Sequence, residues 1–195
     1  MVAKKWIFEK TRRARRILSP MQEIYSSELR IPKERVAVLV GKKGTTKKAL
    51  ERKTHTKIAA TREGEIMVSS EDNIQNYTVS LVIKAIGRGF NPEIATLLLD
   101  EQNTMEIVSI TDMSKKTKKN LDRIRSRLIG KQGKARMMLE TLTNTNISIY
   151  GKTVAIIGPI YDVLIAKHAV EKLVKGAPHG NVYRYIESQK EAQAL

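Results

Sequence analysis

One stretch of this chain occurs twice, and this internal repeat constrains the fold more than any other feature of the sequence. The segment from Leu39 aligns with the segment from Leu128 at an offset of 89 residues, without a gap as far as Val68. Beyond that point the second copy is two residues shorter, and Gly89 matches Gly176. The chain is therefore predicted to consist of two copies of one structural unit. The identical pairs are Leu39 and Leu128, Gly41 and Gly130, Lys42 and Lys131, Gly44 and Gly133, Leu50 and Leu139, Glu51 and Glu140, Thr54 and Thr143, Thr56 and Thr145, and Ile58 and Ile147.

Each copy has the pattern of a small α+β unit. Short strands are predicted over residues 28–31 and 106–110, and each is followed by a helix that ends at a glycine pair. A second helix follows the glycines, because Ala135, Met138, Leu139 and Leu142 recur with helical spacing. Strands are predicted over 57–61, 65–69, 146–150 and 153–157, with turn residues inside each pair, and closing helices over 72–88 and 160–175. The predicted order is β-α-α-β-β-α in each copy.

The residues between the copies predict a short connecting helix. Asn91 is a good N-cap and Pro92 suits the first helical turn. Ile94, Leu97 and Leu98 are expected to pack this helix against one unit, which favours a single fixed body over two loosely linked units. The predicted segments are a basic N-terminal extension (1–26), a first unit (27–90), a connecting helix (91–103), a second unit (104–175) and a C-terminal extension (176–195).

The glycine pairs between the helices suit the binding of phosphate groups. Glycine lets another backbone approach closely, and a helix that begins at the loop directs its free N–H groups into the same space. Ala37 and Ser126 lie one helical turn before the glycines, and their small side chains would leave room for a nucleic-acid base. Ile58 and Ala60 in one copy, and Ile147 and Ile149 in the other, are expected to form the opposite wall. An isolated pair of glycines is often only a turn, so the repetition carries this argument.

Charge favours a polyanionic partner. The chain has 36 Lys and Arg against 20 Asp and Glu, a net charge of +16. One dense basic run lies within residues 1–16, where a solvated tail is as good an interpretation as a specific contact. A second run leads into the second glycine loop and is therefore assigned to RNA; it comprises Lys115, Lys116, Lys118, Lys119, Arg123, Arg125 and Arg127. A membrane surface would need a broad apolar face opposite the cations, and Trp6, Ile7 and Phe8 supply only a small one.

Several other functions are not supported by the sequence. The chain has no cysteine, which excludes disulfides and thiolate chemistry. His55, His168 and His179 show no metal-ligand spacing and no nucleophile–base pattern, so no cofactor and no enzymatic activity are predicted. No apolar run reaches the length of a membrane span, and the first residues do not resemble a signal peptide. A cytoplasmic protein without a membrane partner is therefore expected.

The repeated unit resembles the KH domain in its eukaryotic-type (type I) topology. The β-α-α-β-β-α order and the GxxG loop between the helices carry the resemblance, which implies two tandem KH domains that each clamp about four nucleotides of single-stranded RNA. The residues expected to contact RNA are Ala37, Gly41, Lys42, Lys43, Gly44, Lys47, Ile58, Ser126, Arg127, Gly130, Lys131, Gln132, Gly133, Lys134, Arg136, Ile147 and Ile149.

A narrower resemblance rests on two phrases, AIGRGFNP from Ala85 and GAPHGNVYRY from Gly176. Together with the two KH units they are similar to the archaeal relatives of Dim-two, the partner of the endonuclease Nob-one, a family of ribosome assembly factors. The resemblance implies binding near the 3′ end of small-subunit ribosomal RNA and contact with the Nob-type endonuclease. The alpha subunit of the archaeal initiator-tRNA factor is a further partner candidate. Three alternatives remain open: another KH protein such as an exosome cap or messenger-RNA regulator, an RNA-processing enzyme, and a protein scaffold.

Overall fold

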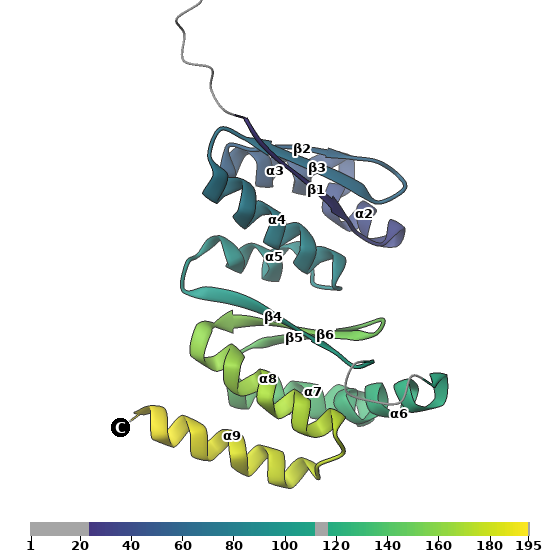
Figure 1. The fold of residues 1–195 in the computed structure, drawn as a ribbon, viewed down its shortest axis with the longest axis vertical. Helices are drawn as coiled ribbons and strands as arrows, with labels where there is room; N and C mark the ends of the chain where they lie inside the picture. Colours follow the sequence, from purple (N-terminus) through teal and green to yellow (C-terminus); the bar gives the residue numbers. More distant parts are fainter. Residues whose placement is uncertain (1–23, 112–116, 195) are drawn as a thin grey trace, which may run out of the picture.

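The two copies fold alike in the computed structural model, which describes residues 24–111 and 117–194. The first unit contains β1 (Tyr25–Arg30), α2 (Lys33–Val40), the 3-10 turn η1 (Lys42–Gly44), α3 (Thr45–Thr54), β2 (Lys57–Ala60), β3 (Glu65–Ser70) and α4 (Asn73–Gly87). The second contains β4 (Asn103–Ser109), α6 (Lys118–Ile129), η3 (Lys131–Gly133), α7 (Lys134–Thr143), β5 (Asn146–Tyr150), β6 (Thr153–Pro159) and α8 (Ile160–Val174). The predicted element order is confirmed (Figure 1).

Each unit has a three-stranded antiparallel sheet, in the order β1-β3-β2 or β4-β6-β5. Ile58 pairs with Val68 in the first sheet, whereas Ile147 pairs with Ile156 in the second. Ile147 and its partner are therefore separated by one residue fewer than Ile58 and its partner, because the second hairpin is one residue shorter. The gapless alignment predicted as far as Val68 is wrong from the hairpin onward.

Several of the residues repeated in the sequence tie the second helix of each unit to the following strand. The Glu51 carboxylate accepts a hydrogen bond from the Ile58 N–H (2.8 Å), and Glu140 does the same for Ile147 (2.8 Å). Buried hydroxyls support the same junction: Thr54 contacts Thr56, and the corresponding threonines of the second unit repeat this pair. These identities follow from the fold, since a buried N–H without a partner is costly.

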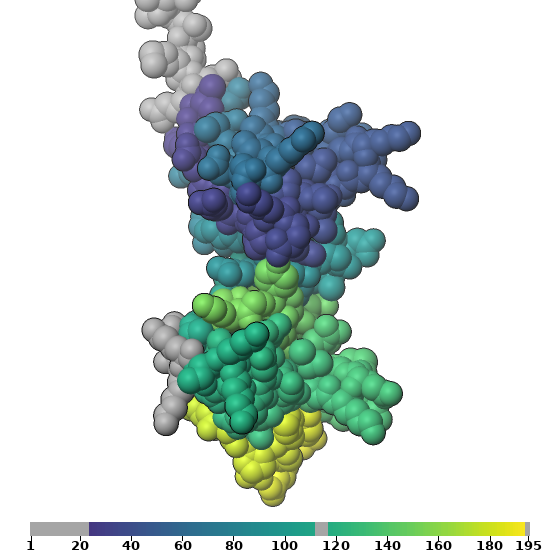
Figure 2. Space-filling model, turned by 90° about the vertical axis from the view of Figure 1, so that its right-hand side faces the viewer, coloured from purple at the N-terminus to yellow at the C-terminus, as the bar shows by residue number. Residues whose placement is uncertain are grey.

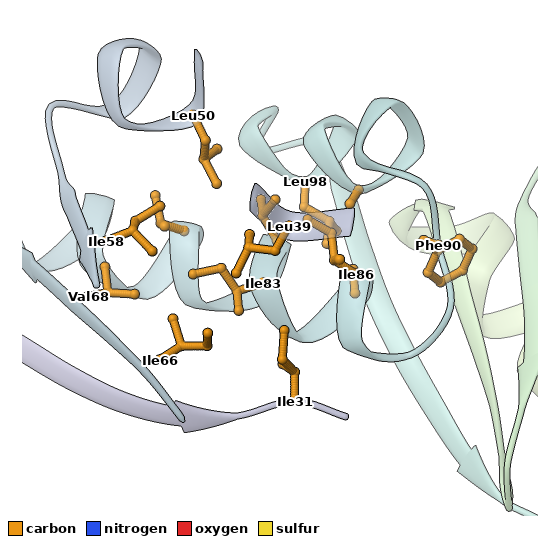
Figure 3. Close-up of a cluster of buried hydrophobic side chains, with 14 of the residues drawn as sticks. Ile31, Leu39, Leu50, Ile58, Ile66, Val68, Ile83, Ile86, Phe90 and Leu98 are labelled. Atoms are coloured by element: carbon orange, nitrogen blue, oxygen red, sulfur yellow. The ribbon is translucent and has the colours of Figure 1, made fainter. Parts of the chain in front are cut away.

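The two units form one body because the second sheet is covered on both faces. Val154 and Ile156 face the core of the second unit, while Ala155 and Ile157 belong to the core cluster of the first. Figure 3 shows Phe90 on the side of that cluster nearest the second sheet. The outer face of the first sheet is open instead: Met67 is 48% exposed. The predicted packing of two units as one body is confirmed (Figure 1).

The connecting segment forms α5 (Pro92–Ala95) and the 3-10 turn η2 (Thr96–Leu99). Asn91 caps it as predicted, since its side chain accepts a hydrogen bond from the Ile94 N–H (3.0 Å). Leu98 is buried, but Leu97 is 42% exposed, so its predicted packing role is wrong. Leu99 packs on the core instead, because a 3-10 turn advances its side chains by three residues per turn and changes which positions face inward.

The C-terminal segment, predicted as an extension, folds against the second unit as helix α9 (His179–Ala194). Val182 and Ile186 are buried in the core of that unit. Asp162, which is 6% exposed, accepts a hydrogen bond from Lys190 and so fixes the far end of α9 to α8. The N-terminal extension lies almost wholly outside the described residues, and its predicted last residue, Ser26, belongs to β1.

Matched glycines test the packing between the units. Gly89 and Gly176 end α4 and α8 at φ of 103° and 102°. A Cβ on Gly176 would meet nothing within 4 Å, whereas a Cβ on Gly89 would lie 2.6 Å from Ser148 Oγ and 3.2 Å from the Tyr150 Cβ of the other unit. Gly176→Ala is expected to cost only backbone strain, about 1–3 kcal/mol. Gly89→Ala should lower the free energy of unfolding by at least about 1 kcal/mol more than Gly176→Ala, because the added methyl group is overpacked against the other unit. Chemical denaturation of the two variants measures the difference, and equal losses would contradict the packing role of Gly89.

Candidate nucleic-acid interface

The two GxxG loops have the same unusual backbone geometry. Gly41 and Gly130 have φ of 73° and 72°, and a Cβ on either would lie 2.2 Å from Thr46 Oγ1 or 2.7 Å from Ala135 Cβ. Glycine is therefore required at the first position of each loop. The loops' third residues, Lys43 and Gln132, also have positive φ (50° and 54°) and are exposed. Non-glycine residues in this region cluster at functional sites.

Helices α3 and α7 begin directly at these loops. The N-cap residues Gly44 and Gly133 have no capping side chain, so no side chain caps these helices within the described part of the chain. The first N–H groups of a helix lack intrahelical partners and carry a partial positive charge. Exposed Lys42 and Lys131 add full charges beside them. The N–H groups of Gly44 and Gly133 are already bonded within the 3-10 turns, to the carbonyls of Gly41 and Gly130. The positive end of the helix and the exposed lysine still give each loop suitable chemistry for a phosphate.

The space beside each loop is lined differently from the prediction. Ala37 and Ser126 are exposed as expected, but Ile58 and Ile147 are only 2% and 3% exposed. Their side chains point into the cores, so neither offers a wall to a base, and this part of the prediction is wrong. Ile58 and Ala60 share one face of β2, and Ile147 and Ile149 share one face of β5, so alternation does not separate them. The two isoleucines lie at the starts of their strands, where the backbone is hydrogen-bonded to the preceding helix through Glu51 or Glu140.

Partly exposed apolar residues lie farther along the same faces of β2 and β5. Ala60 and Ile149, on the outer strands β2 and β5, are partly exposed and remain available. Ile129, directly before the second loop, is 39% exposed and was not predicted from the sequence. Its only sequence signal is its position next to Gly130, which it shares with Val40 in the first unit. The second unit therefore has bulkier apolar residues at these positions than the first.

The remaining predicted cations differ in their surroundings. Lys134 is exposed at the start of α7, beside the loop. Lys47 lies 3.5 Å from Glu51, and Arg136 lies 3.5 Å from Glu140, each one turn along its own helix. These two cations therefore contribute less net charge to a ligand than the loop residues do.

Arg127 is tied into the fold. Its guanidinium donates a hydrogen bond to the Ala177 carbonyl (2.7 Å), its own carbonyl is 3.0 Å from His179 Nε2, and its Nε is buried. In the first unit Arg35 donates to the Phe90 carbonyl, which is the equivalent acceptor. Each arginine satisfies a carbonyl where the chain leaves the closing helix. Arg127 therefore has a structural role in the second unit, and its RNA contact stays a prediction.

The first unit also contacts the second groove. Ser148 and Tyr150 flank Ile149 on β5; Ser148 donates to the Arg88 carbonyl (2.8 Å), and Tyr150 donates to the Glu34 carboxylate. The hydrogen bond from Tyr150 lowers the pKa of Glu34 and is the main reason that the pKa of Tyr150 is raised. The wall strand of the second groove is thus fixed to the helix that leads into the first loop.

The other predicted features fall outside the grooves. His55 is exposed at the end of α3, at the position of Asn144, and His168 lies 3.6 Å from Glu171. The N-terminal basic run and Lys115 and Lys116 lie outside the described residues. Within residues 24–111 and 117–194, no cluster of three potential metal ligands occurs, and none of the helices is long and apolar enough to cross a bilayer.

Comparison with known proteins assigns the family. A model of the eukaryotic type (type I) KH domain matches residues 104–191, and a KH-domain model matches 26–76. A KH domain-containing protein of Methanocaldococcus jannaschii is 40% identical over 167 residues, covering 84% of this chain and 73% of the relative. The structure resembles aDim2p of Pyrococcus horikoshii OT3, solved in a complex with a/eIF2alpha and rRNA, with a TM-score of 0.81, 44% identity, and coverage of 87% of this chain and 96% of that one.

The chain belongs to the Dim2/PNO1 family of KH proteins. Pre-rRNA-processing protein PNO1 of Candida albicans is 34% identical over 103 residues, which is 52% of this chain and 37% of that protein. The chain thus spans well under half the length of that eukaryotic member. The resemblance stated from the two sequence phrases is confirmed, and so is the fold of two type I KH domains. In this Dim2/PNO1 chain the matched second domain extends through most of α9, in agreement with the packing of that helix.

Titration of one tyrosine tests the contact between the units. Glu34→Gln removes the carboxylate that a Tyr150 phenolate would face, so the pKa of Tyr150 is expected to fall toward its ordinary value of 10.0. The ultraviolet absorbance of the phenolate, followed as pH rises, measures this shift. Subtracting the titration of Tyr150→Phe isolates this residue from Tyr183, whose pKa is raised by burial. An unchanged Tyr150 titration in Glu34→Gln would show that the hydrogen bond does not form in solution.

Proposed function

We propose that this chain binds single-stranded RNA with both KH domains and acts in small-subunit ribosome assembly, at the 3′ end of the ribosomal RNA. The observation that carries the proposal is the identical geometry of the two loops, each with positive-φ glycines, an exposed lysine and an uncapped helix start. Family membership supports the target, since relatives are named for pre-rRNA processing and one was solved with rRNA.

Both loops project on the same side of the molecule. Figure 2 shows the second helix of each unit, blue above and light green below, extending toward the same edge. Because the second sheet belongs to both cores, the two loops are held at a fixed separation. One strand that reaches both loops would bind more tightly than either loop alone allows. The phosphates would rest on the loops, and the bases would lie against the walls that contain Ala60 and Ile149.

The partners follow from the same family. The Pyrococcus relative was solved together with a/eIF2alpha, so the alpha subunit of the initiation factor is the proposed protein partner. The Nob-type endonuclease is a second proposed partner, on the resemblance alone. With cleavage assigned to that endonuclease, this chain would hold the RNA without cutting it.

Loop charge reversal tests RNA binding. Lys42→Asp/Lys43→Asp and Lys131→Asp/Gln132→Asp place anions where phosphates would rest, on exposed residues that the fold does not need. Each variant is expected to lose at least about tenfold in affinity for the single-stranded 3′ end of small-subunit ribosomal RNA, about 1.4 kcal/mol. Equilibrium titration at several salt concentrations measures the loss and its salt slope, about 0.7 per phosphate for a single strand.

The matched control reverses two cations away from the loops, Lys84→Asp/Arg184→Asp, on the exposed faces of α4 and α9. It should bind nearly as well as the parent. A scrambled strand of equal length tests the target. Equal binding of both strands would remove the ribosomal assignment, and undiminished binding by both loop variants would refute binding at the GxxG loops.

A further inference from the structure

The second unit contains an insertion that the first lacks. Ile31 and Ile110 follow the opening strands in the same way, since the N–H of each donates to a carbonyl of the hairpin turn, Gly64 or Lys152, at 2.9 Å. Lys33, which starts α2, follows Ile31 by two residues, whereas its counterpart Asp122 follows Ile110 by twelve. Ten residues are therefore inserted, and the last four of them, 118–121, form an added first turn of α6. In Figure 1 this end of α6 extends sideways beyond the sheet.

The added turn changes which cations of the basic run remain available. Arg127 is held by the Ala177 carbonyl, and Arg125 lies 3.4 Å from the Asp122 carboxylate. Lys119 and Arg123 are exposed. The Arg123 guanidinium donates a hydrogen bond to the neutral side-chain oxygen of Asn120 (2.9 Å), which leaves its positive charge intact. Neither Lys119 nor Arg123 forms an ion pair with a carboxylate within residues 24–111 and 117–194.

These two cations are aligned with the second loop. Lys119, Arg123, Ser126 and Gly130 follow one another at intervals of four, three and four residues, which places them on one face of a helix. Ile124, like Leu128, is buried and lies on the opposite face. With a rise of 1.5 Å per residue, the row extends about 16 Å from Lys119 to the loop. A positively charged row therefore runs along α6, away from the second GxxG loop.

The first unit has the opposite charge at the equivalent position. Glu34 aligns with Arg123, and its carboxylate accepts the hydrogen bond from Tyr150. Next to it, Lys33 forms an ion pair with Glu63 of the hairpin turn. The helix before the first loop thus presents a carboxylate and a neutralised lysine where the helix before the second loop presents cations.

We propose that Lys119 and Arg123 bind RNA phosphates immediately beyond the nucleotides clamped at the second loop, so that the second unit holds a longer stretch of strand than the first. The inference rests on the proposed binding of RNA at the GxxG loops. The ligand is the single-stranded RNA backbone, recognised by charge. These contacts add affinity and length without reading sequence.

The test uses the full chain with the first loop silenced by Lys42→Asp/Lys43→Asp. In this background Lys119→Gln/Arg123→Gln is compared with Lys84→Gln/Arg184→Gln, which removes the same charge elsewhere. Each protein is titrated at several salt concentrations, starting from low salt, with two labelled strands: one of about four nucleotides, the length that one KH domain clamps, and one of about twice that length. The Lys119 and Arg123 variant should bind the shorter strand as the background does and lose several-fold in affinity for the longer one. Its salt slope for the longer strand should fall by about 1.4, since each phosphate contact contributes about 0.7.

The other outcomes are decisive as well. Unchanged affinity and slope for the longer strand, or equal losses for both strands, would overturn the inference. So would an equal loss in the Lys84 and Arg184 variant, which would indicate a general effect of net charge. Lys131→Asp/Gln132→Asp in the same background distinguishes failure of RNA binding at the second loop from failure of the added contacts on α6. If that variant loses nothing, RNA binding at the loop itself is wrong, whereas a loss there with no effect of Lys119 and Arg123 leaves the loop and removes only the extension.

Discussion

Strand β6 belongs to two hydrophobic cores at once, and the arrangement of the molecule depends on this. Its residues alternate between the cores, with Val154 and Ile156 facing one side and Ala155 and Ile157 the other. A strand buried on both faces has a continuous apolar sequence, and here that apolar run packs the second unit against η2 of the first. The corresponding strand β3 exposes Met67, because nothing among the described residues covers the outer face of the first sheet. The two units share a fold, but only the second sheet carries the interface.

The repeat could be read from the sequence because the fold makes local demands on particular residues. Gly41 and Gly130 are required by contacts across a tight turn, and Glu51 and Glu140 by a strand N–H that needs a partner. Such constraints leave the same residue in both copies, so the element order, most boundaries and the two loops followed from the pattern. The connecting helix followed from its cap, since Asn91 and Pro92 favour a helix start regardless of what surrounds them.

The errors have a common cause, which is that sequence spacing does not show what packs on the far side of a residue. Ile58 and Ile147 have the chemistry of a groove wall, yet both are buried in the cores at the starts of their strands, while Ala60 and Ile149 on the same faces are only partly buried. Arg127 adjoins the loop in sequence, but α9 returns over the second unit and supplies the carbonyl that the arginine binds. The one-residue difference between the two hairpins could not be predicted either. The two copies are too dissimilar beyond Ile58 for the sequence to show it, and it appears only in the pairing of the strands.

A rigid body of two KH domains binds a strand differently from two domains on a flexible tether. Ile149 lies between Ser148 and Tyr150, which are bonded to the first unit, so the wall of the second groove cannot move without disturbing α2. The separation of the loops is therefore fixed before RNA binds, and little conformational freedom is lost on binding. The same rigidity restricts the strands that can reach both loops, because no linker is available to adjust the span. Under the proposed binding mode, selectivity for one RNA segment can thus arise from the spacing of the loops as well as from base contacts.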